Sequence, residues 1–279
     1  MIGRIALYSV FLISVVSLLV VFVVIKQVSI FMDESLPART LTPGSLTTET
    51  WGIFNPNTGD VITGNNIDGQ RPIASLTKLF TAVAVMESDK RYEGFSIAFS
   101  DVSTEGRAGK LVYGEWMTPY ELLFPLLIES SNDAGEAIRR KLGDAYTESI
   151  ASTTSNLSLA GTHLNDASGL SPGDVSTVRD LSAFYTYLKK RHPHIIDITQ
   201  LTMYVSSRTG YINNNPARSL KNFTGGKNGY TPEAQRTFVG TFVLEDSKTE
   251  VGIILLGSSD ILKDIQTLLS FNEGGTKQF

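Results

Sequence analysis

The 279-residue sequence contains no cysteine. This absence excludes disulfide bonds, thiolate metal ligands and a cysteine nucleophile, and it also excludes attachment to a membrane through a lipid-modified N-terminal cysteine. Any covalent chemistry must therefore use another nucleophile. Any membrane attachment must be made by the polypeptide itself.

Histidine is also scarce, with only His163, His192 and His194 in the chain. The three are scattered and have no evident acidic partner, which argues against a zinc site and against a Ser-His-Asp triad. His192 and His194 flank Pro193 just beyond a Lys-Lys-Arg helix end, where the helix dipole accounts for them. We therefore expect neither a metal nor another cofactor.

The chain lacks blocks of positive charge. It has 24 lysines and arginines against 28 acidic residues, for a formal net charge of −4, and no basic run that could follow a phosphate backbone. Nucleic acid is therefore not an expected partner. With 42% hydrophobic and 19% charged residues, the composition is that of a globular protein.

One long hydrophobic run is present, from Ile5 to Ile25, and it holds no charged residue. At about 1.5 Å per residue it would cover roughly 31 Å, the thickness of the hydrocarbon core of a bilayer. A cleaved signal peptide has a shorter apolar region, so we predict an uncleaved transmembrane signal anchor over residues 1–26. The slight excess of positive charge around Arg4 favours a cytoplasmic N-terminus. This predicts a single-pass protein of the cell membrane with its folded part on the outer face.

Beyond the anchor, the pattern predicts a linker over residues 27–49, a folded domain over 50–270 and a short polar tail over 271–279. Strands and helices alternate in the domain, with antiparallel hairpins at both ends, so we expect an α/β (α+β) fold. Strands are expected at 50–54, 61–63, 95–99, 203–206, 225–230, 236–244 and 250–257, and helices at 73–86, 118–130, 134–142, 146–158, 178–190 and 260–270.

The segment RPIASLTKLFTAVAVM carries the first candidate reaction centre. Pro72 suits a first helical turn, and a spacing of three puts Ser75 and Lys78 on one face of the helix expected over 73–86. A serine becomes a nucleophile when a base is within reach, and a lysine becomes a base when apolar or positive surroundings lower its pKa. Taken alone, the pair is also compatible with a first-turn serine beside a solvated lysine, because short motifs of this kind often occur by chance.

Two further polar clusters follow along the chain. Ser130 and Asn132 lie between two apolar helices, where polar side chains either cap a helix or enter a cleft. Lys227-Asn228-Gly229 lies on a strand near the end. Arg208-Thr209-Gly210 competes for the place of this third cluster, since it offers a cation and a hydroxyl. It precedes a turn-rich stretch, however, and not a pair of long strands.

With Ser-x-x-Lys, Ser-x-Asn and Lys-x-Gly in this order, the sequence resembles the penicillin-recognising serine enzymes, and among them the low-molecular-weight D-alanyl-D-alanine carboxypeptidases. The resemblance covers about residues 50–269 and extends to IASLTKLFTA, LLIESSNDAGEAI, NDASGL and GGKNGYTPEA. It implies a β-lactamase/transpeptidase-like fold. In that fold an antiparallel sheet is flanked by helices, with an all-helical subregion.

The resemblance also implies roles for the clustered residues. Ser75 would attack the carbonyl between two D-alanines and form an acyl-enzyme, Lys78 would take its proton, and Ser130 would pass a proton to the leaving amine. Asn132 would bind the substrate backbone. Lys227 would attract the terminal carboxylate of the substrate and lower the pKa of Lys78.

The strand residues around Lys227 complete the implied substrate site. Gly229 would let the substrate lie close against the strand. The backbone amides of Ser75 and Tyr230 would form the oxyanion hole. Asn228 departs from the family, which has threonine or serine there. Its amide can donate to a carboxylate but is bulkier, which puts carboxylate recognition and turnover in question.

A second departure is the absence of the arginine that often follows the glycine of the last strand in related enzymes. Here Gly257 is followed by two serines. The Thr231 hydroxyl and the Arg236 guanidinium are the nearby groups that could compensate.

The implied function is a serine-type D-Ala-D-Ala carboxypeptidase acting on peptidoglycan stem peptides, with β-lactam antibiotics as covalent inhibitors. Endopeptidase cleavage of peptide cross-links would use the same site and stays open. A penicillin-binding protein that holds cell-wall peptide without efficient turnover also stays open, because of Asn228. A β-lactamase is disfavoured, because the expected Glu-x-x-x-Asn is missing: Glu148 is followed four residues later by Ser152.

Overall fold

The computed structural model describes residues 45–103, 109–206, 208–245 and 248–273. The predicted anchor over residues 1–26, most of the predicted linker and residues 274–279 of the predicted tail lie outside these ranges. Across the described ranges, no helix is both long enough and apolar enough to cross a bilayer.

A five-stranded antiparallel sheet forms the frame of the domain, with the strand order β2-β1-β11-β10-β9. Its strands are β1 (Thr50–Phe54), β2 (Val61–Asn65), β9 (Phe223–Thr231), β10 (Gln235–Val243) and β11 (Glu250–Ser258). The hairpins predicted at both ends of the domain are confirmed. The sheet joins them because β1 from the start of the domain pairs with β11 from its end. Strand β9 is left at an edge.

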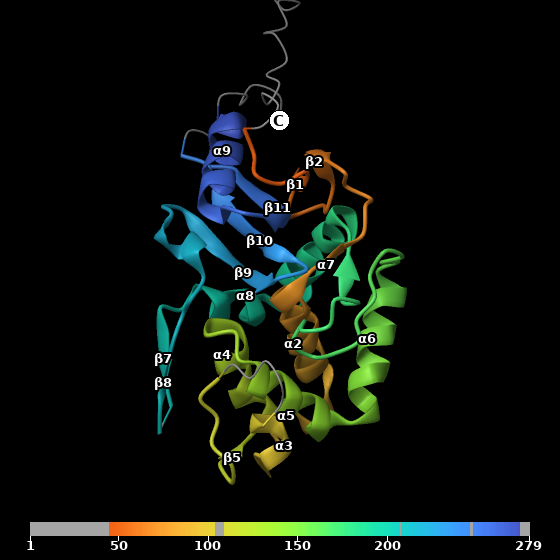
Figure 1. Cartoon of the computed structure of the whole chain (residues 1–279), viewed down its shortest axis with the longest axis vertical. Helices are drawn as coiled ribbons and strands as arrows, with labels where there is room; N and C mark the ends of the chain where they lie inside the picture. Colours follow the sequence, from red (N-terminus) through yellow and green to blue (C-terminus); the bar gives the residue numbers. More distant parts are fainter. Residues whose placement is uncertain (1–44, 104–108, 207, 246–247, 274–279) are drawn as a thin grey trace, which may run out of the picture. The chain divides into compact units, whose positions relative to one another are not determined.

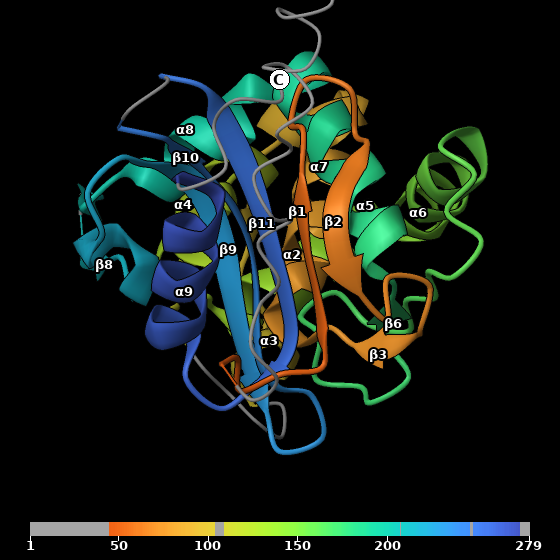
Figure 2. The same cartoon turned by 90° about the horizontal axis from the view of Figure 1, so that it is seen from above.

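Eight helices are described: α2 (Thr77–Glu87), α3 (Phe99–Val102), α4 (Pro119–Ile128), α5 (Asn132–Leu142), α6 (Asp144–Asn156), α7 (Val178–Arg191), α8 (Pro193–Gln200) and α9 (Ile261–Glu273). Helix α9 lies on one face of the sheet, and α7 and α8 lie on the other (Figure 2). Helices α2, α4, α5 and α6 gather below the sheet in the view of Figure 1. They form the all-helical subregion that the resemblance implies.

Short elements connect these layers. They are the strand pairs β3 (Arg71–Pro72) with β6 (Val175–Ser176), β4 (Phe95–Ser96) with β5 (Trp116–Met117) and β7 (Met203–Val205) with β8 (Gly210–Ile212), and the 3-10 turns η1 (Ala74–Leu76), η2 (Asp89–Tyr92) and η3 (Pro216–Ser219).

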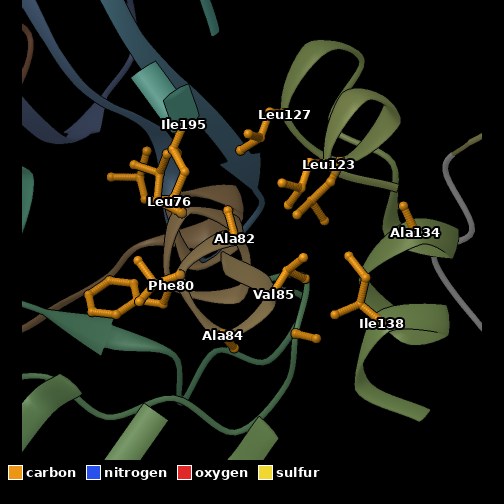
Figure 3. Packing of buried hydrophobic residues seen from close by; sticks show 14 of the residues in the cluster. Leu76, Phe80, Ala82, Ala84, Val85, Leu123, Leu127, Ala134, Ile138 and Ile195 are labelled. Carbon is orange, nitrogen blue, oxygen red and sulfur yellow. The ribbon is translucent and has the colours of Figure 1, made fainter. Parts of the chain in front are cut away.

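Helix α2 lies at the centre of the hydrophobic core. Its residues from Thr77 to Val85 are all buried, as expected for a helix enclosed by its neighbours. Figure 3 shows Val85 of α2 facing Leu123 of α4 and Ile138 of α5. Burying a side chain of this size stabilises the fold by about 1.5–3 kcal/mol. Contacts with α4 and α5 therefore hold in place the helix that carries Lys78.

The predicted start of this helix is wrong. Pro72 belongs to strand β3 and not to a first helical turn, because Arg71 and Pro72 pair with Ser176 and Val175. The next amide, Ile73 N–H, donates to the Asp174 carbonyl at 2.9 Å. This bond extends the β3–β6 pairing by one residue, and the α-helix begins only at Thr77.

Two other predictions need correction. The strand expected at 95–99 is only two residues long, since Phe99 begins the short helix α3. Helix α8 was not predicted at all, because Pro193 breaks the periodic pattern of α7. The structure places Pro193 in the first turn of α8, where its missing N–H is not needed.

Candidate active site

Ser75 lies in the 3-10 turn η1, directly before α2. The preceding residue, Ala74, has a φ of +48°, which is left-handed and unfavourable for a residue with a Cβ by roughly 1–2 kcal/mol. Gly169 packs against this turn so closely that a Cβ on it would lie 1.9 Å from the Ala74 carbonyl oxygen. Strain of this kind persists where surrounding structure enforces it, and it is typical of functional sites.

Lys78, one turn further along, is fully buried with 0% of its surface exposed. Its Nζ lies 2.9 Å from Ser75 Oγ, 2.8 Å from Asn132 Oδ1 and 2.6 Å from the backbone oxygen of Ser168. The amide oxygen and the backbone carbonyl can only accept hydrogen bonds. A neutral amine therefore donates its two hydrogens to them and directs its lone pair at the Ser75 hydroxyl.

The pKa of Lys78 is lowered well below its usual value. Burial is the largest cause, because the ammonium form loses its hydration, and the positive charge of Lys227 lowers the pKa further. The carboxylates of Asp166 and Asp174 act in the opposite direction and are the smaller influences. The arrangement thus places an amine of lowered basicity within proton-transfer distance of Ser75.

The Ser168 carbonyl is delivered by a loop that Asp166 organises. The Asp166 carboxylate accepts hydrogen bonds from the backbone amides of Ser168 at 2.7 Å, Gly169 at 2.5 Å and Ser171 at 2.6 Å. Carboxylates bonded to several backbone amides hold a loop in one conformation. Asp166 therefore fixes both the Ser168 oxygen at Lys78 and the contact of Gly169 with Ala74.

A second acid, Asp174, ties the same loop to the start of α2. Its side chain accepts from Thr77 Oγ1 at 3.1 Å and from Asn165 N at 2.7 Å. Burial raises its pKa to about 6. The sequence pattern NDASGL was matched to the family, but no roles for Asp166, Ser168 or Asp174 were predicted. No sequence signal distinguishes Asp166 and Asp174 from other acidic residues in loops. The Ser168 contact is made by its backbone carbonyl, which every residue has.

The Ser-x-Asn cluster forms the junction of α4 and α5. Ser131 caps α5 by accepting from Ala134 N at 3.1 Å, and Asn132 is the first residue of that helix. Asn132 thereby points its Oδ1 at Lys78. Ser130 is half-buried and has a left-handed φ of +64°. With the residues that the structure describes, its hydroxyl makes no hydrogen bond.

Strand β9 brings the third cluster against the serine turn. A Cβ on Gly229 would lie 2.7 Å from the backbone nitrogen of Ser75, so only glycine allows this approach. From β10, Thr237 Oγ1 donates to the Ile73 carbonyl at 2.9 Å and ties the sheet to the peptide that leads into Ala74. The Ser75 amide thus lies directly beside the edge of the sheet.

Lys227, the cation of this cluster, is 1% exposed and donates to the Asn228 carbonyl at 2.7 Å. Burial lowers its pKa to about 7. The Asn228 side chain is half-buried, and its Oδ1 is screened from solvent without a partner in the described residues. A buried acceptor left unpaired costs about 1–3 kcal/mol of folding free energy, so Asn228 destabilises the folded domain by about this amount.

The last two predicted substrate residues lie further along β9. Tyr230 is 57% exposed, and the Arg236 guanidinium lies 5.5 Å from the centre of its ring. Thr231 Oγ1 accepts from Ala234 N at 3.1 Å inside the β9–β10 turn. Its hydroxyl is therefore engaged in forming the turn.

The competing cluster lies elsewhere. Arg208 and Thr209 form the turn between β7 and β8, and Gly210 begins β8. This hairpin is a separate two-stranded sheet. The stretch after Gly210, predicted to be a turn, starts with strand β8, but that strand does not belong to the sheet that borders Ser75.

Two of the three histidines, His192 and His194, have acidic partners that the sequence did not reveal. His192 Nε2 lies 3.2 Å from Glu87 Oε1, and His194 Nδ1 lies 3.5 Å from Asp197 Oδ2. The expectation of no acidic partner is therefore wrong for these two histidines. The Tyr187 hydroxyl contacts both Glu87 and His192. The described part of the chain holds no group of three or more His, Cys, Asp or Glu side chains that could bind a metal ion.

Proteins of similar sequence are named as D-alanyl-D-alanine peptidases. A family model described as D-alanyl-D-alanine carboxypeptidase matches residues 37–258. D-alanyl-D-alanine carboxypeptidase DacB2 of Mycobacterium tuberculosis is 27% identical over 202 residues, which is 69% of each chain. A D-alanyl-D-alanine endopeptidase of Pseudomonas aeruginosa is 30% identical over 135 residues, which is 47% of this chain and 44% of that protein.

Solved structures share the fold. The crystal structure of a D-alanyl-D-alanine carboxypeptidase from Mycobacterium tuberculosis superposes with a TM-score of 0.76 at 22% identity, covering 88% of this chain and 96% of that one. Penicillin-binding protein D2 of Listeria monocytogenes in its cefotaxime-bound form gives a TM-score of 0.73 at 24% identity, covering 86% and 100%. The described domain therefore has the α+β penicillin-binding, transpeptidase-like fold.

Proposed function

The chain belongs to the D-alanyl-D-alanine carboxypeptidase family. We propose that it removes the terminal D-alanine of peptidoglycan stem peptides through an acyl-enzyme on Ser75. The observation that carries the proposal is the contact of 2.9 Å between Lys78 Nζ and Ser75 Oγ, made by an amine whose pKa is lowered. A base within hydrogen-bond reach is what a serine nucleophile requires.

In the proposed acylation, Lys78 accepts the hydroxyl proton as Ser75 Oγ bonds to the carbonyl carbon of the penultimate D-alanine. The C–N bond to the terminal D-alanine then breaks. Ser130 passes its proton to the departing amine and takes the proton that Lys78 accepted, so both groups return to their starting state. The backbone amides of Ser75 and Tyr230 stabilise the oxyanion. A water molecule then hydrolyses the ester and restores Ser75.

The edge strand β9 supports this assignment of the substrate site. An extended peptide can add to an exposed sheet edge through backbone hydrogen bonds. Gly229 allows β9 itself to lie against the serine turn, because a Cβ there would lie 2.7 Å from Ser75 N. Lys227 and Asn228 would meet the terminal carboxylate, Thr231 would lie at the far end of the strand, and Asn132 would bond the substrate backbone.

Endopeptidase cleavage of cross-links is a second candidate function. The Pseudomonas relative favours it, because that protein is named as an endopeptidase and is 30% identical over 135 residues. A binding protein without efficient turnover is a third candidate, favoured by the unpaired Asn228 Oδ1.

β-Lactam antibiotics are proposed covalent inhibitors of the chain. The strained lactam carbonyl would be attacked by Ser75 in place of the peptide. The fold shared with a protein solved in its cefotaxime-bound form supports this proposal.

We also propose that residues 1–26 anchor the chain in the cell membrane, with the catalytic domain on the outer face. The uncharged run from Ile5 to Ile25 supports this proposal. Expression of the full chain and of a chain lacking residues 1–26, followed by carbonate extraction, tests it. Release of the full chain with the soluble fraction would contradict it.

The central experiment supplies a stem pentapeptide ending in D-Ala-D-Ala to wild type and to Ser75→Ala and measures free D-alanine. Wild type should release D-alanine and Ser75→Ala should not. A cross-linked dimeric peptide supplied in parallel distinguishes endopeptidase cleavage. Penicillin acylation without release from either peptide would support the binding protein instead.

A further inference from the structure

Three consecutive asparagines, Asn213 to Asn215, cross the space between β9 and the α4–α5 junction. We call this segment the asparagine bracket. Asn213 Nδ2 donates to the carbonyls of Thr199 at 2.8 Å and Leu201 at 2.9 Å, and its Oδ1 accepts from Asn215 N at 3.0 Å. The bonds to Thr199 and Leu201 attach the bracket to the end of α8, and the bond between Asn213 and Asn215 fixes the conformation of the bracket itself.

One end of the bracket holds the peptide directly before Lys227. Asn215 Nδ2 donates to the Gly226 carbonyl at 3.1 Å, while Gly226 N–H donates to Thr199 Oγ1 at 2.9 Å. Asn215 is 6% exposed and Thr199 is 1% exposed, so both bonds are buried. Side chains outside the sheet therefore satisfy both polar groups of this residue.

The conformation at Gly226 explains why such a hold is needed. Its φ is +153°, and a Cβ there would lie 2.3 Å from the Val239 carbonyl oxygen. Only glycine is accommodated, and glycine is the residue with the greatest backbone freedom. Without external bonds, the direction of the chain entering Lys227 would be poorly determined.

The other end of the bracket holds the peptide directly before Ser130. Asn214 Nδ2 donates to the Glu129 carbonyl at 2.8 Å, and Asn214 N donates to the Ile128 carbonyl at 3.2 Å. These carbonyls belong to the end of α4, where the chain turns into the left-handed φ of Ser130. The segment thus contacts the residues that precede two of the three reactive clusters.

We propose that the asparagine bracket is a positioning element that sets Lys227 and Ser130 relative to Ser75, with Asn215 as its principal residue and Thr199 as its partner on Gly226. The inference rests on the proposed function, because it assigns to these residues a part in acylation of Ser75. None of the three asparagines is placed in contact with the reacting atoms. They act through the backbone on either side.

The test measures the second-order rate of acylation by a fluorescent penicillin, per folded molecule, in Asn215→Asp and Thr199→Val. The first substitution keeps the acceptor for Ala217 N and replaces the donor that faces the Gly226 carbonyl. The second removes the acceptor for Gly226 N–H at nearly constant volume. A misplacement of about 1 Å can cost roughly 10²-fold in rate, so each variant should lose about ten-fold or more.

Asn156→Asp is the matched control, since Asn156 is exposed on α6 and bonds only within that helix. It should acylate at the wild-type rate. The double variant Asn215→Asp, Thr199→Val should lose less than the product of the single losses, because both residues act on one peptide. A purely structural role would instead lower the melting temperature and leave the rate per folded molecule unchanged.

Asn214→Ala covers the case in which a buried variant does not fold, because Asn214 is exposed. Its acylation rate should fall about three-fold or more at an unchanged melting temperature. Wild-type rates in every folded variant overturn the inference. Failure of the wild-type chain itself to acylate would instead overturn the proposed function, so the two outcomes are distinguishable.

Discussion

Two regions meet at Ser75, and they are built differently. We call Ser75, Lys78, Asn132 and the Ser168 carbonyl the nucleophile pocket, and the run from Lys227 to Thr231 the β9 edge. In the pocket, the Lys78 amine bonds to three oxygens inside the core. At the edge, Asn228 Oδ1 is buried without a partner among the described residues, and Tyr230 faces solvent.

The difference separates the tasks of the two regions. The pocket is complete without substrate, so its geometry is preorganised for proton transfer and costs no rearrangement during the reaction. The edge has backbone groups and an unpaired side-chain acceptor that a bound peptide could engage. Substitutions in the pocket should therefore abolish acylation of Ser75, and substitutions at the edge should change its rate by smaller factors.

The largest effect is expected from Lys78→Met, which keeps the length of the side chain and removes the base. The rate of penicillin acylation should fall by about 10²- to 10⁴-fold, the range for loss of a general base. Stopped-flow fluorescence measures the rate, and circular dichroism reports whether the variant is folded.

Lys78→Arg is the matched control for charge. Arginine keeps a cation and its donors but is not deprotonated in proteins, so it cannot act as the base. It should be as inactive as the methionine variant. Acylation by Lys78→Arg within ten-fold of wild type would show that the pocket works without a base at this position.

The next effect is expected from Asp166→Asn, which tests whether the loop behind the pocket is part of it. One oxygen that accepts from backbone amides becomes a donor facing them. The free energy of unfolding should fall by about 1.5–3 kcal/mol, as for a hydrogen bond to a charged group. Acylation should slow by about ten- to 10²-fold as the Ser168 carbonyl leaves Lys78.

Urea denaturation and acylation kinetics check the two parts of this prediction. Asp68→Asn is the control, since Asp68 forms an exposed ion pair with Arg179 and should leave both quantities unchanged. If Asp166→Asn lowers stability without slowing acylation, Asp166 supports the fold and not the pocket.

Deprotonation of Lys78 in the pocket and of Lys227 at the β9 edge should have opposite effects on kcat/KM. In the proposed mechanism Lys78 acts as a neutral base, so kcat/KM should rise with pH as its lowered pKa is passed. In the proposed mechanism Lys227 acts as a cation. Its pKa is about 7, so its charged fraction falls about ten-fold between pH 6 and pH 8, and kcat/KM for the pentapeptide should fall on the alkaline side for this reason. The profile should be bell-shaped.

Lys227→Arg separates the two limbs. It keeps the positive charge at alkaline pH, so the alkaline fall should disappear while the acidic rise remains. An alkaline limb that stays in place in Lys227→Arg would mean that another group controls it.

The smallest effect is expected from Asn228→Thr at the edge. A hydroxyl is smaller than the amide and removes the unpaired buried acceptor, so turnover of the pentapeptide should rise by a few-fold to about ten-fold. Steady-state release of D-alanine measures it. Asn228→Ala tells bulk from bonding, because a gain equal to that of threonine would implicate size alone. An unchanged or lower rate in Asn228→Thr would contradict this account of the position.

The same contrast explains what could be predicted from sequence. The structure brings together the Ser75 and Lys78 pair, Asn132 and the strand with Gly229. These residues were recognisable because each motif consists of particular side chains at a short spacing. The hairpins and most helices followed from periodicity and turn residues. The antiparallel sheet was expected from the resemblance.

The missed features depend on backbone groups and on contacts between distant segments. No local signal shows that the carbonyl of Ser168 reaches Lys78, or that Gly169 forces Ala74 into a left-handed conformation. Pro72 was assigned to a helix because its pairing partner, Val175, lies about a hundred residues away. Contacts of this kind are specified by the packed fold, and short patterns do not contain them.

The central claim is that Ser75 is the acylated residue, and localising the adduct tests it most directly. The wild-type chain is incubated with penicillin, digested, and mapped by mass spectrometry. One penicilloyl group should be found, on the peptide that contains Ser75, and Ser75→Ala should carry none. An adduct on another serine such as Ser130, or no adduct at all on the folded wild-type chain, would contradict the account.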